Sequence, residues 1–440
     1  MSNQAPAVPV NEGNAALDWD RWYVLLLLTV AYALNVADRY VVNTLIEPIK
    51  HEFGLSDLGV GLLTGTAVAL FYCSASVPMA IWGDRRSRKP IIVLAVSVWS
   101  LLTLLSGMSG TFWQFFAARL GVGIGEAGAT PISQSLLSDK FPPRLRSFVF
   151  TLFVLGAAAG AAAGASLGGF LSDKYGWRAA LMIFGAFGFP LAFLIAMSVK
   201  EPMRGRFDQR HLSVKPSLSS TLHFMMKQRS LRHLFIGSSV VTFWSWGLIW
   251  WTPTFLLRSR GMSLGDGGSL LGLIHGLGGV VVTLATAGVM KLFADKDPRY
   301  PLWFVGVTTC IATIPAFFAY WTNSTALSMS MLWFYISVTY TFSGPSYALA
   351  QNLVPADMRS QSCALILLTA NVTNLILAPV VVGFASDMVA PHLTQPDQAL
   401  RYVLAGGALT GFWGAWHYFK AAAPLREDLV RAGVERSVSV

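Results

Sequence analysis

The sequence predicts an all-α polytopic membrane protein with twelve transmembrane helices arranged in two six-helix bundles. Hydrophobic residues make up 54% of the chain and charged residues 12%, and the mean hydropathy is +0.54. Apolar blocks of about 20 residues, the length that crosses a bilayer, recur along all 440 residues. One long polar segment separates six of these blocks from the other six. Together these observations exclude a soluble protein.

The twelve predicted spans follow one another with mostly short connections. The first six cover residues 21–46, 58–82, 91–109, 112–137, 147–171 and 178–199. The last six cover residues 232–257, 266–291, 301–321, 326–353, 361–386 and 400–420.

The polar segment divides the chain into five parts. Residues 1–20 form a tail, 21–199 a first bundle, 200–231 a linker, 232–420 a second bundle, and 421–440 a second tail. The polar segment contains two prolines and several serines and is interpreted as a linker between the two bundles.

Basic residues gather in the loops after the second and fourth spans and in the linker. They include Arg85, Arg86, Arg88, Lys89, Lys140, Arg144, Arg146, Lys200, Arg204 and Arg210. The positive-inside rule then places these loops and both termini in the cytoplasm, in a protein of the cell (inner) membrane. Because the net charge of +10 is spread over short loops rather than over one face, we expect no nucleic-acid partner.

The two halves carry matching short segments at nearly constant separation. Gly-Leu-Ser at 54–56 recurs as Gly-Met-Ser at 261–263, an offset of 207. Gly-Phe-Leu-Ser-Asp at 169–173 recurs as Gly-Phe-Ala-Ser-Asp at 383–387, an offset of 214. Matches that keep their order and spacing indicate a parallel internal repeat.

Four charged residues lie inside predicted spans and away from their ends, namely Asp38, Arg39, Arg119 and Glu126. An ionised side chain near the centre of a membrane helix costs roughly 2.5–3.5 kcal/mol, so such residues usually line a cavity, a partner or a transport path. A static polar network that holds the first and fourth spans together is the structural alternative.

Depth along the helices predicts which charges meet. At 1.5 Å per residue, Asp38 lies roughly 25 Å into the first span, and the antiparallel fourth span reaches Arg119 after roughly 10 Å and Glu126 after roughly 20 Å. We therefore predict an ion pair between Asp38 and Arg119. Glu126 lies two turns along the same face and is expected to line the same cavity, whereas Arg39 faces a neighbouring wall.

The loop after the second span resembles a signature of the major facilitator superfamily, G-x-x-x-D-R-x-G-R-[KR]. The matching positions are Ala80, Asp84, Arg85, Ser87, Arg88 and Lys89, with two glycines replaced. The resemblance implies that Asp84, Arg85 and Arg88 form a cytoplasmic gate between the two bundles. Arg119 followed by Gly123 and Gly125 is similar to the arginine motif of the family's fourth span. Five glycines in the fifth span, with a spacing mostly of four, are expected to permit close helix contact.

Within that superfamily, most of the first half resembles the spinster lipid transporters. The resembling segments are 35–39 (Asn-Val-Ala-Asp-Arg), 83–89 (Gly-Asp-Arg-Arg-Ser-Arg-Lys), 119–127 (Arg-Leu-Gly-Val-Gly-Ile-Gly-Glu-Ala) and 201–202 (Glu-Pro). The resemblance implies the major facilitator fold and an amphipathic lipid as substrate. A first span of this kind is shared with carriers of organic anions, so a sugar acid or a drug is the alternative substrate.

Aromatic and amide side chains in the second half are the remaining candidates for substrate contact. Trp244 and Trp251 are seven residues apart, so on one helix face they would form an apolar wall, with Asn371 as a polar contact. Packing inside the bundle is the alternative for the tryptophans. His275 is either a second titrating group or a packing histidine.

These residues predict a proton-coupled secondary transporter that works by alternating access of the two bundles. An anionic or zwitterionic headgroup would compete for Arg119, and Asp38 or Glu126 would then take up a proton. The sequence holds no catalytic constellation, metal-ligand cluster or phosphate-binding loop, so we expect no enzyme activity and no cofactor. The expected partners are the substrate, protons and membrane lipids, and we expect a monomer. A membrane sensor or scaffold that does not transport is the alternative from another class.

Overall fold

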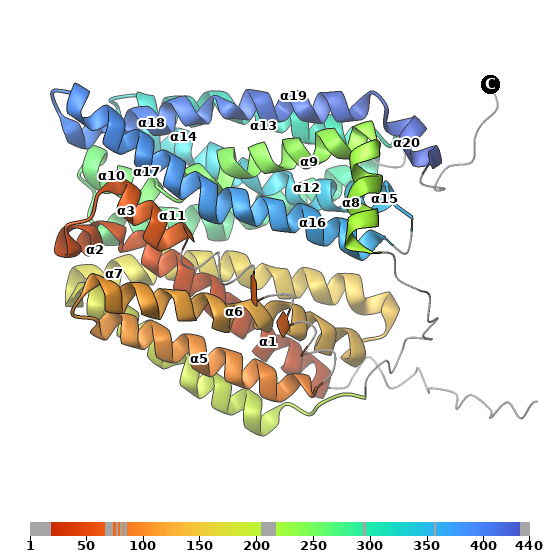
Figure 1. Ribbon diagram of the computed structural model, residues 1–440, viewed down its shortest axis with the longest axis horizontal. Helices are drawn as coiled ribbons and strands as arrows, with labels where there is room; N and C mark the ends of the chain where they lie inside the picture. Colours follow the sequence, from red (N-terminus) through yellow and green to blue (C-terminus); the bar gives the residue numbers. More distant parts are fainter. Residues whose placement is uncertain are drawn as a thin grey trace, which may run out of the picture.

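The structure is a computed structural model that describes residues 19–431 except 67–73, 76–77, 80–81, 83–85, 204–216, 294–295 and 356–357. In this part of the chain, all regular secondary structure is helical. Figure 1 shows two groups of helices side by side, one coloured red to yellow-green and one green to blue. They correspond to the predicted first and second bundles.

The first bundle contains α-helices of very different length and a π-helix, a helix with i→i+5 hydrogen bonds. They are α1 (Trp19–Thr44), α2 (Ile46–Phe53), α3 (Asp57–Gly61), η2 (Leu62–Thr66), α5 (Arg88–Met108), α6 (Phe112–Lys140) and α7 (Pro143–Ser198), η2 being the π-helix. Gly176 interrupts the long α7 with a φ of 83°, which only glycine adopts readily. α7 therefore supplies both the fifth and the sixth predicted span.

The second bundle is divided into shorter helical segments. Its elements through the tenth span are α8 (Leu218–Lys227), α9 (Arg229–Thr242), η3 (Phe243–Gly247), α10 (Thr252–Arg260), α11 (Leu264–Leu273), η4 (Ile274–Gly278), α12 (Gly279–Phe293), α13 (Tyr300–Trp321), α14 (Thr325–Val338), η5 (Thr339–Thr341) and α15 (Ser343–Asn352). The last are α16 (Arg359–Asn371), η6 (Val372–Leu377), α17 (Ala378–Val389), η7 (Ala390–His392), η8 (Pro396–Gln398), α18 (Ala399–Ala408), α19 (Thr410–Ala422) and α20 (Leu425–Arg431).

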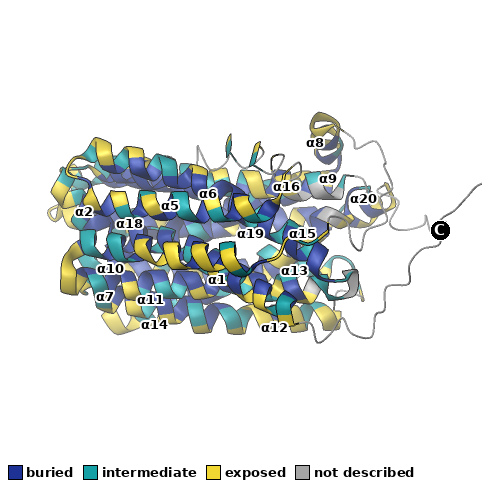
Figure 2. Cartoon of the chain, turned by 90° about the horizontal axis from the view of Figure 1, so that it is seen from below, coloured by how far each residue is buried: buried dark blue, intermediate teal, exposed yellow. Residues whose placement is uncertain are grey.

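Eleven of the predicted spans coincide with helical stretches, and the second, residues 58–82, is described only in part: residues 58–66 are helical, and 67–73, 76–77 and 80–81 lie outside the described residues. Within the described part, six helical stretches are long and apolar enough to cross a membrane, and the pair Arg229–Gly247 with Thr252–Arg260, bent by 42°, makes seven if it is counted as one span. α6 coincides with the predicted fourth span and contains both Arg119 and Glu126. Exposed residues lie on the outward faces of the helices and buried residues between them (Figure 2). A bilayer would cover this exposed apolar surface.

The glycines of α7 bring it into close contact with α1. A Cβ atom at Gly160 would lie 2.2 Å from the carbonyl oxygen of Ala33, and one at Gly164 would lie 2.5 Å from that of Ala37. No side chain fits at such distances, so these glycines are required for the helices to touch, as the sequence predicted.

The repeated Gly-x-Ser segments have one structural role in both halves. Gly54 and Gly261 end α2 and α10 in the left-handed conformation, with φ of 61° and 64°. Ser56 and Ser263 then cap α3 and α11, because each Oγ accepts a hydrogen bond from a backbone N–H three residues later. The repeat therefore encodes one helix end followed by one helix start.

The molecule has two distinct ends along its long axis. α8 and α20 lie at one end, on the right in Figure 1, and we call it the linker end. α2, α3 and α10 lie at the opposite end, which we call the far end.

Candidate functional site

The predicted ion pair between α1 and α6 is present and fully buried. Arg119 Nη1 lies 2.9 Å from Asp38 Oδ2, and the two side chains are 2% and 5% exposed. Two hydroxyl groups of α5 complete the network. Thr103 Oγ1 donates to Asp38 Oδ1 at 2.5 Å and accepts from Arg119 Nη2 at 3.0 Å, while Ser106 Oγ accepts from Arg119 Nε at 3.1 Å. Each charge is thus paired and hydrogen-bonded, as burial requires.

A second ion pair, which the sequence analysis did not predict, joins the other two charges. Arg39 Nη2 and Nε lie 2.6 and 2.7 Å from Glu126 Oε2. The Arg39 side chain is 20% exposed, whereas that of Glu126 is fully buried. Glu126 Oε1 has no hydrogen-bond partner among the described residues. The expectation that Arg39 faces a separate wall is therefore wrong.

The two pairs line one cavity between the bundles. Its walls contain Asp38, Arg39, Val42, Thr64, Gly65, Arg119, Val122, Glu126, Trp250 and Leu375. The empty space between these residues amounts to about 410 Å³, its open side included. Glu126 lines the same cavity as Asp38, as predicted. Charged groups occupy one side, and the remaining side chains are mostly apolar.

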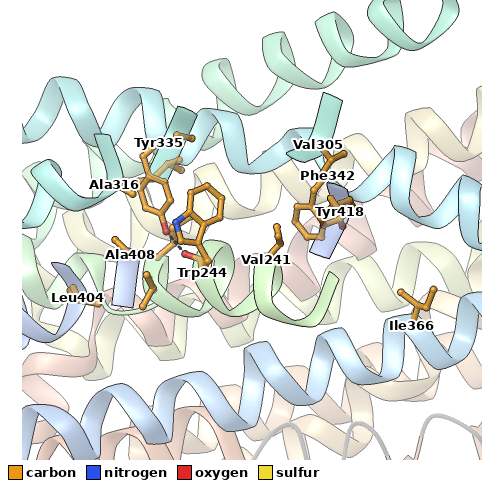
Figure 3. Close-up of a cluster of buried hydrophobic side chains, with 14 of the residues drawn as sticks. Val241, Trp244, Val305, Ala316, Tyr335, Phe342, Ile366, Leu404, Ala408 and Tyr418 are labelled. Carbon is orange, nitrogen blue, oxygen red and sulfur yellow. Dashed lines mark hydrogen bonds between the residues drawn. The ribbon is translucent and has the colours of Figure 1, made fainter. Parts of the chain in front are cut away.

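Trp244 and Trp251 do not line this cavity, contrary to the predicted apolar wall. Both are at most 1% exposed and belong to the core of the second bundle. Trp244 lies edge-on against Tyr335, whose hydroxyl donates to the Trp244 carbonyl oxygen (Figure 3). The alternative, packing, holds for both residues.

Trp250 lines the cavity, where Trp244 and Trp251 were expected. Its Nε1 donates to Thr64 Oγ1 of the first bundle at 3.3 Å. The physical reason is that η3 is a π-helix and is followed by a bend, so the rule that residues seven apart share a face does not extend across this segment. Asn371 precedes the π-helix η6 and is also absent from the lining, to which Leu375 contributes instead.

The predicted cytoplasmic gate is only partly visible, because Asp84 and Arg85 lie outside the described residues. Arg88 is buried, and its guanidinium lies 2.5 Å from Asp139 of α6 and 2.8 Å from Glu201. It also donates to the Pro202 carbonyl oxygen at 3.3 Å. These contacts join the ends of α5 and α6 to the chain after α7. Arg88 therefore braces the first bundle in this conformation instead of bridging the two bundles.

At the far end, the two bundles are joined by an interbundle charge cluster. Arg258 of α10 donates to both carboxylate oxygens of Glu47 at 3.0 Å, and to Asp57 at 2.7 and 2.9 Å. Lys50 and Ser386 also bond to Asp57, at 2.6 and 2.7 Å. At the linker end, by contrast, the ion pairs in the described part of the chain each join parts of one bundle. The conformation is therefore closed at the far end.

His275 is buried near this interface. Its Nδ1 lies 2.9 Å from the Tyr340 hydroxyl, and its ring contacts Trp246 and, from the first bundle, Tyr40. This packing is the alternative that the sequence left open. The sequence analysis missed Thr103, Ser106, Trp250 and Arg258. The signal that points to Thr103 and Ser106 is a hydroxyl residue at every third position of the predicted third span, namely Ser97, Ser100, Thr103, Ser106 and Ser109.

The major facilitator superfamily model matches residues 28–392. An MFS-type efflux pump of Mycolicibacterium smegmatis is 29% identical over 93% of this chain and 94% of its own length. Protein spinster homolog 1 of Xenopus tropicalis is 27% identical over 93% of this chain and 82% of its own. The sphingosine-1-phosphate transporter SPNS2 of Danio rerio is 31% identical over 53% of this chain and 47% of its own.

Solved structures give the same result. A bacterial homolog of the human lysosomal transporter spinster, in an inward-facing and unoccupied conformation, is 26% identical over 93% of this chain and 98% of its own, with a TM-score of 0.84. The occupied inward-facing form gives a TM-score of 0.80. These relatives are transporters, not enzymes. The chain is an integral membrane transporter that belongs to the major facilitator superfamily and is similar to its spinster proteins over almost its whole length.

Proposed function

We propose that this protein is a proton-coupled secondary transporter of an amphipathic lipid, such as a lysophospholipid or a sphingolipid-like molecule. The observation that carries the proposal is the pair of buried ion pairs, Asp38 with Arg119 and Arg39 with Glu126, on one wall of a cavity between the bundles. Charges that persist at this depth in a membrane protein usually belong to a transport path.

The two pairs differ in how easily a substrate reaches them. The Asp38–Arg119 pair is held by Thr103 and Ser106 and is nearly inaccessible. The Arg39 side chain is partly exposed, and among the described residues its partner Glu126 has one oxygen without a hydrogen bond. An anionic headgroup therefore meets Arg39 first, displaces the Glu126 carboxylate, and leaves Glu126 to bind a proton. Asp38 and Arg119 form the deeper second pair of the same relay.

The walls opposite the charges support an amphipathic substrate. Val42, Val122, Leu375 and the Trp250 ring provide apolar surface within the same cavity as the charges. An acyl chain would lie against this surface while a phosphate or carboxylate faces Arg39. The similarity to a sphingosine-1-phosphate transporter supports a lipid. The similarity to an efflux pump favours the second candidate, a small organic anion or drug bound at the same arginines.

We propose that the linker end lies in the cytoplasm. We also propose that the protein is in the cell's inner membrane and that it is a monomer. The basic residues of the linker and of the loops after α6 support this orientation. In that orientation, the closed far end faces outward and the conformation is inward-facing.

The test is uptake of a labelled lysophospholipid into proteoliposomes under an imposed pH gradient. We expect gradient-dependent flux from the native protein, and at least a tenfold loss in Asp38→Asn and in Glu126→Gln. Asp397→Asn, which removes an exposed carboxylate remote from the cavity, is the matched control and is expected to transport normally.

Three outcomes would contradict parts of the proposal. Native flux equal to that of empty liposomes would contradict a lipid substrate, and small organic anions would then be the next substrates to assay. If both carboxylate variants keep the gradient-dependent flux, the two ion pairs do not couple protons to transport. A lack of net flux for every substrate class would favour a sensor or scaffold.

A further inference from the structure

Two hydrogen-bonded contacts cross between the bundles at the far end, and they are made by the repeated sequence segments. Asp387 of α17 accepts hydrogen bonds from the backbone N–H groups of Asp57 (3.0 Å) and Leu58 (2.8 Å). Asp173 of α7 accepts one from the backbone N–H of Gly265 (2.7 Å). The donors are the first N–H groups of α3, which continues without a break into η2, and of α11.

The same two places also contain close backbone approaches between the bundles. A Cβ atom at Gly383 would lie 2.4 Å from the carbonyl oxygen of Asp57, and one at Gly169 would lie 2.1 Å from that of Leu264. In each contact, a glycine permits close approach of a helix from the other bundle, and an aspartate four residues later caps that helix.

The offsets in the sequence make these contacts equivalent. Gly383 and Asp387 lie 214 positions after Gly169 and Asp173 in the sequence, and Leu264 lies 207 positions after Asp57. From this correspondence we infer that a reciprocal latch closes the far end. The Gly-x-x-x-Asp segment of the first bundle caps α11 of the second bundle, and the Gly-x-x-x-Asp segment of the second bundle caps α3 of the first. Each capped helix follows a Gly-x-Ser segment. Asp173 and Asp387 are the positioning residues of this latch.

The latch stabilises the closed far end because it satisfies helix N-terminal N–H groups across the interface. An aspartate there interacts with unpaired N–H groups and with the positive end of the helix dipole. When the bundles separate at the far end, both helices lose these caps together. This inference rests on the proposed alternation of the two bundles.

The two arms of the latch have unequal strength. The Asp387 arm uses both carboxylate oxygens and adjoins the interbundle charge cluster through Ser386, which donates to Asp57 at 2.7 Å. The Asp173 arm uses one oxygen of an exposed side chain. An asparagine has one acceptor oxygen, so it replaces Asp173 more completely than it replaces Asp387.

The experiment measures the distance between the bundles by pulsed electron spin resonance on detergent-solubilised protein. Spin labels are placed at Gly110→Cys and Thr325→Cys, both exposed at the far end, after replacement of the three native cysteines. The variants are Asp387→Asn, Asp173→Asn and Asp173→Ala. Asp428→Asn is the control, because Asp428 also accepts from a helix N-terminal N–H, that of Ser230, but within the second bundle.

We expect a longer-distance population that is about fivefold greater in Asp387→Asn and Asp173→Ala than in the unsubstituted protein, the size expected for loss of a helix cap. Asp173→Asn is expected to change it less than Asp387→Asn, and Asp428→Asn not at all. Distance distributions that stay unchanged in Asp387→Asn and Asp173→Ala would overturn the latch while leaving the proposed transport intact. A distribution that never changes, even with substrate or altered pH, would count against alternation itself.

Discussion

At the scale of single residues, the charges of this protein fall into two classes that differ in their surroundings. The cavity pairs face empty space, and among the described residues Glu126 Oε1 has no hydrogen-bond partner, whereas Arg88 is surrounded by acceptors from α6 and from the chain after α7. Partly satisfied groups are suited to a site that exchanges partners, and fully satisfied groups to a structural brace. The contrast supports the proposed transport role of the first class and predicts a stabilising role for the second.

The brace predicts a pH-dependent contribution to stability. Burial raises the pKa of Glu201, but hydrogen bonds from the Arg88 side chain and from the backbone N–H groups of Lys89 and Arg88 lower it, and the net shift is downward. A carboxylate with a lowered pKa stabilises the fold above its unfolded pKa of about 4.3, and this stability is lost as the pH falls through the folded value.

We therefore expect Glu201→Gln to lower the free energy of unfolding by about 1 kcal/mol at pH 7, since Glu201 is partly exposed to solvent. The difference from the native protein should shrink progressively below about pH 4.3. Thermal unfolding in detergent at a series of pH values measures it, with the exposed Glu427→Gln as the control for loss of one charge. A difference that is constant with pH would contradict this account of the brace.

At the scale of helices, glycine decides where backbones meet, and the contacts serve two purposes. Gly160 packs α7 on α1 inside the first bundle, whereas Gly61 and Gly65 pack α3 and η2 against α17 and η6 of the other bundle. Contacts inside a bundle persist throughout a transport cycle, but contacts between bundles separate when the far end opens. The same residue type therefore supports stability in one place and switching in another.

Alanine substitutions separate these two purposes. In Gly160→Ala, the new Cβ would lie 2.2 Å from the Ala33 carbonyl oxygen, so we expect a loss of about 1–3 kcal/mol in stability from overpacking. In Gly61→Ala, the Cβ would lie 2.3 Å from the Pro379 carbonyl oxygen, and opening of the far end relieves that clash. We expect a smaller loss of stability and a larger open population.

Gly288→Ala is the matched control for both variants, because no atom beyond the neighbouring backbone of its own helix lies within 4 Å of the position that its new methyl group would take. Thermal unfolding and the spin-label distance described above give the two readouts. Equal effects of Gly160→Ala and Gly61→Ala on both readouts would argue against the division between static and switching contacts.

At the scale of the whole molecule, the closed far end and the basic linker end define a direction across the membrane. The interbundle charge cluster and the proposed latch hold one end together, and in the proposed orientation the other end lies in the cytoplasm. Substrate would enter or leave this conformation from the cytoplasmic side.

That direction predicts the reactivity of single cysteines toward a membrane-impermeant maleimide. We expect Gly110→Cys, exposed at the far end, to react in intact cells, and Ala423→Cys, exposed after α19, to react only after the cells are opened. Both variants are made in a chain without its three native cysteines. The opposite pattern would reverse the proposed orientation.

The order of the spans, the internal repeat and the pairing of Asp38 with Arg119 all follow from the amino-acid sequence, because apolar length and rise per residue set how deep each side chain lies. The folded chain was needed to establish that Arg39 meets Glu126, and that Trp250 rather than Trp244 or Trp251 reaches the cavity. Depth does not specify how a helix is rotated, and the π-helical turns and the bend after η3 change that rotation locally. The reciprocal latch likewise required the fold, since its partners lie about 90 and 330 residues apart in the chain.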